Sequence, residues 1–286
     1  MVHARPFSFT DDAISVALPS ASPLAVNFSA PPDGPASPQP PADASLQLFK
    51  LRCLQSSWYQ ELFQSNPADA LPDAAAFVWK ACADMQIWFQ NLPKALPANI
   101  QEMFKLEVLY SFVFCLSPSA RAPYMTTYGR ALIFEHAICY IDAAFKAAHG
   151  DSAGFYTYHD ALRLFFMGSQ LVAVLRETCD VLLAGWKGPL PISNFGQALG
   201  QPLIPYRSGG GDNLDCSLRA IECVSQTLRK YGERWEDALH LMESFGAISQ
   251  DVVQGLDQRK TMRDAAALIA ATERDETRMH GQHHPM

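Results

Sequence analysis

One stretch of the chain, Gln101–Ser117, has apolar residues on almost every side of the helix that its spacing predicts. Its only charged side chains are Glu102, Lys105 and Glu107, which all lie in the first two turns. A helix that is apolar nearly all round is buried on most sides, so several other helices must pack around this one. The predicted helix ends at Ser117, because the residue before a proline avoids the helical conformation. The stretch is shorter than the roughly twenty residues that a helix needs to cross a bilayer.

Six further segments repeat apolar residues at intervals of three and four, which is the spacing of amphipathic helices. The segments are Leu46 to the break at Asn66-Pro67, Asp73 to Leu92-Pro93, Tyr128–His149, Tyr156–Leu183, Leu214–Tyr231 and Trp235–Leu256. Asp73 is expected to cap the second of them, because its side chain can accept a hydrogen bond from the free backbone N–H groups of the first turn. No segment alternates apolar and polar residues for long enough to predict a strand. The sequence therefore predicts an all-α fold.

The remaining segments lack such periodicity and set the expected boundaries. Residues 1–45 hold nine of the twenty prolines, so we expect a disordered, proline-rich leader that serves as a linker or as a ligand for a proline-binding module. Residues 46–256 are expected to form one helical domain, and residues 257–286 a peripheral helix and flexible tail. Trp186–Asn213 contains four prolines and three consecutive glycines, and we expect a mobile loop that proteases cut early. The glycines lack the Lys-Ser/Thr of a phosphate-binding loop.

Composition narrows the classes of function. The 286 residues carry a net charge of −7, with 22 Lys and Arg against 29 Asp and Glu, which argues against direct binding of nucleic acid by this chain. The seven cysteines are odd in number and widely spaced, so buried thiols in a reducing compartment are the expected state. No pair has the two-residue spacing of a zinc or redox motif. The N-terminus has no signal-peptide pattern, and we expect an intracellular protein without a membrane segment.

The candidates for chemistry are few. A helical metal-dependent hydrolase is one hypothesis, because imidazole and carboxylate groups together suit a divalent metal. Its ligands would come from His136, His149, His159, Asp160 and Asp180. Their spacing is not diagnostic, and the adjacent His159-Asp160 also fits the first turn of a helix, where an acidic residue caps the backbone.

Other polar and thiol groups point to structural roles. Three histidines, His280, His283 and His284, lie in the expected tail, and the cysteines Cys216 and Cys223 fall on one helical face that suits the core. Ser169 follows Gly168 inside a predicted helix and does not form a nucleophile elbow. We assign no catalytic, cofactor-binding or metal-binding residue.

Four blocks of sequence resemble a known family. They are KLRCLQSSWYQELFQ at 50–64, WKACADMQIWFQNLP at 79–93, LYSFVFCLSPS at 109–119 and YGERWEDALHLMESFGAISQDVV at 231–253. Together they are similar to the middle homology region of fungal zinc binuclear-cluster transcription factors, especially the regulators of secondary-metabolite gene clusters. The resemblance covers roughly residues 45–256 and implies a helical regulatory domain in the nucleus. It implies contacts with other transcription factors or coregulators, and it allows a homodimer or a small-molecule effector.

The chain departs from that family at the DNA-binding module. Those regulators carry an N-terminal domain of six cysteines that binds two zinc ions and grips DNA. Here the first cysteine is Cys53, inside the first predicted helix, so no zinc ligand can be carried over. A fragment, a gene model without its first exon and a regulator-like protein without a DNA-binding arm are the three explanations. We expect no sequence-specific DNA binding by this chain alone. A further alternative is an interaction module that dimerises with a full-length regulator.

Overall fold

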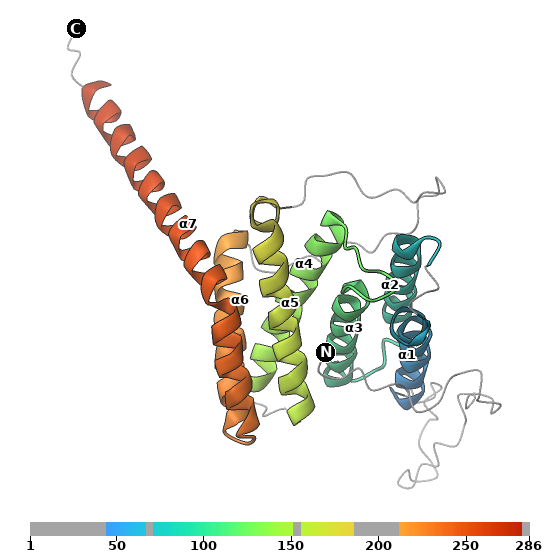
Figure 1. Ribbon diagram of the computed structural model, residues 1–286. Helices are drawn as coiled ribbons and strands as arrows, with labels where there is room; N and C mark the ends of the chain where they lie inside the picture. The colour runs from blue at the N-terminus through green and yellow to red at the C-terminus, as the bar shows by residue number, and fades with distance from the viewer. Residues whose placement is uncertain (1–43, 67–70, 151–155, 186–211, 282–286) are drawn as a thin grey trace, which may run out of the picture. The chain divides into compact units, whose positions relative to one another are not determined.

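The computed structural model describes residues 44–66, 71–150, 156–185 and 212–281, without the side chains of residues 273–281. The described residues are almost all helical and contain no strand, which confirms the predicted all-α class (Figure 1). In chain order the elements are α1 (Ala44–Tyr59), the π-helical turn η2 (Gln60–Gln64), α2 (Ala74–Gln90), α3 (Ala98–Leu116), α4 (Thr127–His149), α5 (Tyr158–Leu183), α6 (Asn213–Gly232) and α7 (Asp237–Gly281). Residues 1–43 of the expected leader and residues 186–211 of the expected loop lie outside the described residues. The last two residues of the expected leader, Ala44 and Ser45, are the first residues of α1.

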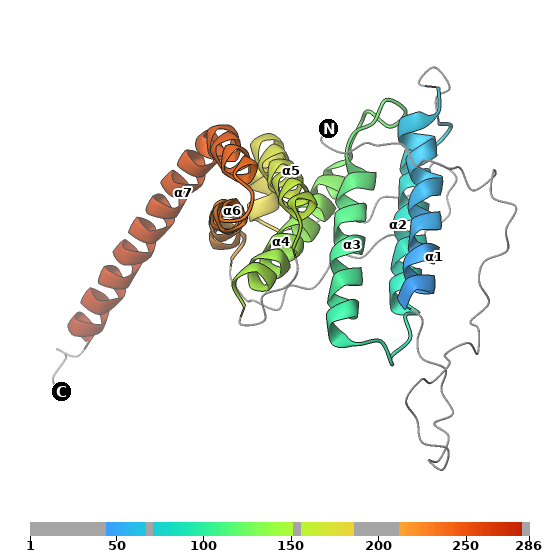
Figure 2. The ribbon, with the colours of Figure 1, turned by 90° about the horizontal axis from the view of Figure 1, so that it is seen from below.

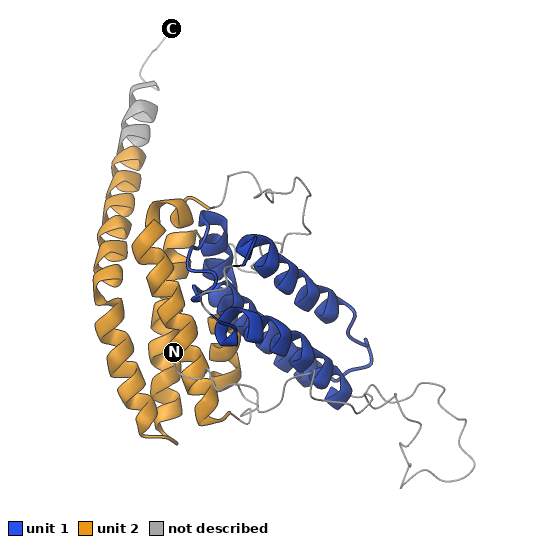
Figure 3. Cartoon of the chain, turned by 45° about the vertical axis from the view of Figure 1, so that its right-hand side comes forward, with its two compact units in different colours: residues 1–140, 187–205 blue, residues 141–186, 206–286 orange. Residues whose placement is uncertain are grey.

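The chain divides into two compact units (Figure 3). The first comprises residues 1–140 and 187–205, and the second comprises residues 141–186 and 206–286. The boundary falls within α4, whose first part belongs to the first unit and whose last turns belong to the second. The expectation of a single domain over residues 46–256 stays a prediction, and each unit is described here by itself.

In the first unit, α1, α2 and α3 pack against one another (Figure 2). The segment between η2 and α2 includes the predicted cap: the Asp73 carboxylate accepts a hydrogen bond of 2.8 Å from the Ala76 backbone N–H. Helix α3 ends where the sequence predicts, because Ser117 takes an extended conformation before Pro118. The bounds of the helices thus follow from local capping and proline chemistry.

Helix α3 is the most buried of these three helices, as its sequence predicts. Nine of its side chains are buried, and they lie on several sides of the helix: Phe104, Glu107, Val108, Leu109, Ser111, Phe112, Val113, Cys115 and Leu116. Aromatic contacts reach three neighbours. The Phe104 ring meets Trp88 of α2 at 5.2 Å between centroids, Phe114 meets Phe63 of η2 at 5.0 Å, and Phe112 stacks on a ring of α4. Burial of these rings is the main source of stability in this unit.

In the second unit, α5, α6 and α7 pack together. All three helices come close together at Gly168 of α5, where an added Cβ would lie 2.8 Å from the Phe245 ring of α7 and 3.1 Å from Val224 of α6. A larger residue at position 168 would push these helices apart. The hydroxyl of the next residue, Ser169, donates a hydrogen bond to the Phe165 carbonyl at 2.7 Å. Ser169 is therefore a helix-interior serine, as the sequence predicts.

Helix α7 differs from its prediction. We expect a break near Leu256 and a separate peripheral helix from Asp257, but one continuous helix runs from Asp237 to Gly281. The change in pattern at Asp257 marks the place where α7 stops burying apolar side chains, since Leu256 is the last fully buried residue among the described side chains of the helix. No glycine or proline follows until Gly281 to end the helix. Among all the described residues, no helix is both long enough and apolar enough to cross a membrane.

The burial of α3 predicts the effect of a charge in it. Phe112 is 2% exposed, so Phe112→Asp should lower the free energy of unfolding by about 3–5 kcal/mol, because it removes ring burial and leaves a carboxylate without a partner. Met103→Asp is the matched control, since this side chain on the same helix is 39% exposed and should lose less than about 1 kcal/mol. Denaturant unfolding measures both. Equal stability of the two variants would contradict the assigned burial.

Candidate functional site

The histidine at the centre of the hydrolase hypothesis is a core residue. His136 lies in the buried part of α4, its Nδ1–H donates to the Leu132 carbonyl at 2.7 Å, and its ring stacks on Phe112 at 4.7 Å. Burial lowers the pKa of His136 to about 4, although the hydrogen bond to the backbone works in the opposite direction. The imidazole is therefore neutral at pH 7 and packs as a flat apolar group.

The other candidate ligands have separate structural roles. Asp160 forms a capping box at the start of α5, where it accepts hydrogen bonds from the Thr157 backbone N–H at 2.7 Å and from its hydroxyl at 2.9 Å. Asp180 pairs with Arg259 of α7 at 2.6 Å. His149 stacks on the Phe145 ring, one turn earlier in the same helix, at 4.2 Å.

The structure does not bring these residues together as a metal site. Across the residues that it describes, no three His, Cys, Asp or Glu side chains gather closely enough to hold a metal ion. His159 is exposed in the first turn of α5. The side chains of His280, His283 and His284 lie outside the description. The described candidates are thus distributed over helix caps, an ion pair and the core.

Four of the seven cysteines are buried, as the sequence predicts, and the other three, Cys53, Cys139 and Cys179, are partly exposed. Cys216 and Cys223 are buried in α6, where they are part of the core of the second unit. In the first unit, burial raises the pKa of the Cys82 thiol, and the nearby Cys115 raises it further. A thiol whose pKa is raised is a poor nucleophile at neutral pH, so these groups serve packing.

A ladder of polar contacts joins α1 to α3, and the spacing of residues in the sequence does not predict it. The Arg52 guanidinium donates to the Glu107 carboxylate at 2.9 Å and to the Gln55 side-chain oxygen at 2.6 Å. The Gln55 amide donates to Ser111, whose hydroxyl donates to the Glu107 carbonyl at 2.7 Å. Glu107, Gln55 and Ser111 are all buried. Buried polar groups need partners, so this ladder fixes how α1 lies along α3.

A shallow pocket lies at the C-terminal end of α3. It has a volume of about 40 Å³ and is lined by residues of α2, by the end of α3, by the loop that follows and by the start of α4, including Trp79, Cys115, Tyr124 and Met125. Sites for small organic ligands usually span about 300–1,000 Å³. This pocket has room for a water molecule and not for a metabolite, so it offers no site for the small-molecule effector.

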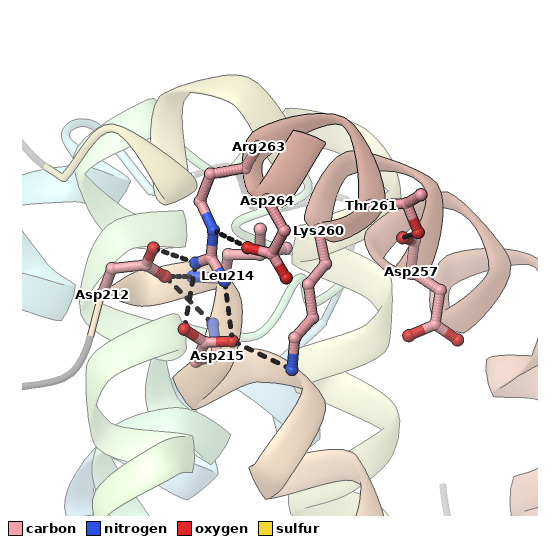
Figure 4. Close-up of polar contacts among 8 residues, drawn as sticks. All are labelled: Asp212, Leu214, Asp215, Asp257, Lys260, Thr261, Arg263 and Asp264. Atoms are coloured by element: carbon pink, nitrogen blue, oxygen red, sulfur yellow. Dashed lines mark hydrogen bonds and ion pairs between the residues drawn. The ribbon is translucent and has the colours of Figure 1, made fainter. Parts of the chain in front are cut away.

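The densest charged cluster of the second unit joins α7 to the start of α6 (Figure 4). Arg263 of α7 forms ion pairs with Asp212 and with Asp215, the second at 2.9 Å. Lys260 reaches the same Asp215 at 3.3 Å. Asp212 also caps α6, because its Oδ1 accepts hydrogen bonds from the backbone N–H groups of Leu214 at 2.7 Å and Asp215 at 3.0 Å. The cluster therefore ties α7 to a helix cap.

The electrostatics of this cluster are consistent with fixed charges. The Arg263 guanidinium holds the pKa of the Asp215 carboxyl below its usual range, with help from Lys260. The Asp215 backbone N–H, together with Arg263, lowers the pKa of Asp212. Both carboxylates stay ionised near neutral pH, so the cluster is a permanent clamp and not a proton-transfer site.

Large apolar side chains are exposed around and beyond this clamp. Met262, Leu268 and Ile269 of α7 are 71%, 70% and 61% exposed. Soluble proteins usually scatter single apolar residues on their surface, but these three fall within eight residues of one helix. The sequence predicts only a peripheral helix here, because periodicity alone does not tell which residues a neighbouring helix covers.

The environment of His136 predicts a pH dependence of stability. The folded-state pKa of about 4 lies below the ordinary value of 6.5, so the unfolded chain binds more protons between these pH values, and stability falls as the pH drops through this range. We expect the free energy of unfolding at pH 5 to be roughly 2 kcal/mol lower than at pH 7.5. His136→Phe should remove most of this difference. The control His240→Gln changes an exposed residue and should keep it; an unchanged pH dependence in His136→Phe would contradict the assignment.

Comparison with known proteins finds no relative of this chain. The chain matches no protein-family model, no curated protein and no solved structure. The resemblance of its four sequence blocks to fungal regulators therefore remains a prediction, and the function has to be argued from the residues themselves.

Proposed function

We propose that the chain is the regulatory domain of a fungal transcription factor, and that it acts through contacts with other proteins in the nucleus. We also propose that this transcription factor controls a secondary-metabolite gene cluster. Its partners would be other transcription factors or coregulators. Under this proposal the chain has no catalytic activity of its own.

One observation carries the proposal: the four blocks that resemble the family coincide with helices and helix ends, and their aromatic residues are core contacts. In the first unit, the block at 50–64 spans α1 and η2 and contains the buried Trp58. The block at 79–93 follows α2 to its end and contains Trp79 and Trp88, which are also buried. The block at 109–119 spans the end of α3 and its break at a proline.

The fourth block, residues 231–253, spans the end of α6, the turn and the first part of α7 in the second unit. Its Arg234-Trp235 pair lies in the turn, with the guanidinium 4.9 Å from the indole centroid, and its Phe245 is fully buried. Signature residues that hold helices together in this way suit a family that shares a scaffold and not a reaction. The separate structural roles of His136, Asp160 and Asp180 support the same view over the hydrolase alternative.

A reporter assay tests the regulatory role. The chain is fused to an unrelated DNA-binding domain with a known operator, and expression of a reporter gene is measured in a fungal host. We expect the fusion to raise or lower expression at least several-fold. Met103→Asp should keep the effect, whereas Phe112→Asp should lose it because its fold is lost. A wild-type fusion that behaves like the DNA-binding domain alone would overturn the proposal.

DNA binding is the companion test. Sequence-specific recognition needs clustered Lys and Arg and an element that enters a groove, and this chain has an acidic balance. Anisotropy titrations at about 150 mM salt, near physiological ionic strength, should detect no sequence-dependent binding of promoter duplexes by the chain alone. Binding that appears only after fusion of a six-cysteine module would agree with the proposal. Tight, sequence-dependent binding by the isolated chain would contradict it.

A further inference from the structure

Two cysteines of the first unit meet between α2 and α3. Cys82 of α2 and Cys115 of α3 are 0% and 1% exposed, and a hydrogen bond joins their thiols. The two helices pack against each other along their length (Figure 2). The pair is therefore a buried contact between two helices, and neither cysteine is isolated in the core.

The places of the two cysteines follow from the way in which the helices pair. Trp88, near the end of α2, meets Phe104, near the start of α3, at 5.2 Å between ring centroids. Cys115 comes eleven residues after Phe104, which is about three helical turns, so it lies on the same side of α3. Cys82 comes one turn after the buried Val78 and shares its side of α2, and Val78 and Cys115 line the same pocket. Both cysteines thus lie on the sides by which α2 and α3 face each other.

A small oxidant has a route to one thiol of the pair. Cys115 is one of the residues that line the shallow pocket at the end of α3, whereas Cys82 is not. The pocket volume of about 40 Å³ exceeds the roughly 10–15 Å³ that one water molecule needs, so hydrogen peroxide, with its two oxygen atoms, fits. Glutathione, a tripeptide, is far too large. Peroxide therefore reaches Cys115 first, and larger thiols reach neither sulfur.

We propose that Cys82 and Cys115 are a redox-sensitive pair, which hydrogen peroxide converts to a disulfide bond that links α2 to α3. Peroxide transfers one oxygen atom to the Cys115 sulfur, its O–O bond breaks, water leaves, and Cys115 becomes a sulfenic acid. The Cys82 sulfur then attacks the Cys115 sulfur, so that the S–S bond forms and the S–O bond breaks. The hydroxyl group leaves with the Cys82 proton as a second water molecule. The two thiols together lose two electrons, and peroxide is reduced to water.

The contact between the thiols decides the role of Cys82. Burial raises the pKa of the Cys82 thiol, and Cys115 raises it further, so Cys82 reacts slowly with an oxidant in solution. A sulfenic acid at Cys115 forms directly beside it, and a reaction between two groups that are already held together needs no encounter. Cys82 therefore acts as the second thiol of the reaction. In the reduced protein both side chains pack as small apolar groups.

The disulfide bond changes the stability of the first unit. It draws the two sulfur atoms from a hydrogen-bond contact to about 2.0 Å, and it closes a loop of about thirty residues. A closed loop lowers the entropy of the unfolded chain, so the oxidised protein should unfold at a temperature several degrees higher than the reduced protein. The proposal does not depend on the transcriptional role, because it concerns only how the fold of this unit responds to an oxidant.

Oxidation of the full, folded chain tests the proposal. The chain is treated with millimolar hydrogen peroxide, catalase removes the peroxide, N-ethylmaleimide blocks the remaining thiols in denaturant, and mass spectrometry of peptides gives the state of each cysteine. We expect one pair of peptides joined through Cys82 and Cys115. Cys216 and Cys223 are the internal control, because they are also buried. Seven residues of one helix separate their Cα atoms by about 10.5 Å, beyond the limit of roughly 7 Å for a disulfide, so these two should remain thiols.

Two variants separate the roles of the two thiols. In Cys82→Ala, oxidation of Cys115 should stop at the sulfenic acid, which dimedone labels, whereas in Cys115→Ala the Cys82 thiol should stay unlabelled. Circular dichroism should show that both variants keep the helical fold, and peroxide should not raise the unfolding temperature of either.

Three results would overturn the proposal. The first is a wild-type chain in which Cys82 and Cys115 both stay thiols or end as separate sulfinic acids. The second is dimedone labelling of Cys82 in Cys115→Ala, which would show that the pocket is not the route of the oxidant. The third is a linked wild-type chain that unfolds at the same temperature as the reduced chain.

Discussion

The burial of α3 is the constraint on which the first unit depends. A helix with apolar residues on nearly every side cannot remain at a surface, so α1, α2 and the first part of α4 pack against it through Phe114, Phe104 and Phe112. Apolar burial is not directional and would tolerate many ways of placing α1 on α3. The ladder from Arg52 through Glu107 removes that freedom, because a shift of one helix along the other would leave buried polar groups without partners. Burial thus supplies the stability, and the ladder supplies the register.

The second unit uses α7 in two different ways. Its first half is a core helix that meets α5 where Gly168 permits a close approach. The clamp around Arg263 then fixes the helix on the cap of α6, and beyond it the helix presents apolar residues outward. A helix held at one end and exposed at the other presents a preformed surface, and a preformed surface loses less conformational entropy on binding. The proposed regulatory function needs such a surface and no catalytic group.

Local sequence patterns predict most of the helices, but they do not predict contacts between residues that are far apart in the chain. The cap at Asp73, the end of α3 at Ser117 and the burial of Phe112 all follow from rules that act over a few residues. The ladder does not, because Arg52 and Glu107 are 55 residues apart and each could as well have been a solvated charge. The predicted end of the last core helix near Leu256 is wrong for a related reason. The apolar pattern of α7 changes at Asp257 because no described apolar side chain of the helix is buried beyond Leu256, while the backbone stays helical.

Sequence patterns likewise do not predict the surroundings of the candidate metal ligands. A sequence shows that His136 is a histidine but not that Phe112 and the Leu132 carbonyl enclose it, and only this environment makes it a neutral core group. The sequence allows Asp160 to be either a metal ligand or a helix cap, and the capping box with Thr157 shows that it caps α5. Exposure of Met262 and Ile269 could not be predicted either, since helical spacing alone gives no information on which face a neighbour covers.

Native-state hydrogen exchange tests the central claim, that α3 is the buried centre of the first unit. The account predicts that the backbone amides from Phe104 to Leu116 exchange only when this unit unfolds as a whole. Their exchange free energies should then equal the free energy of unfolding measured with denaturant, and should fall with low denaturant at the same slope. Amides of α3 that exchange through local opening, with lower free energies and no dependence on denaturant, would contradict the account.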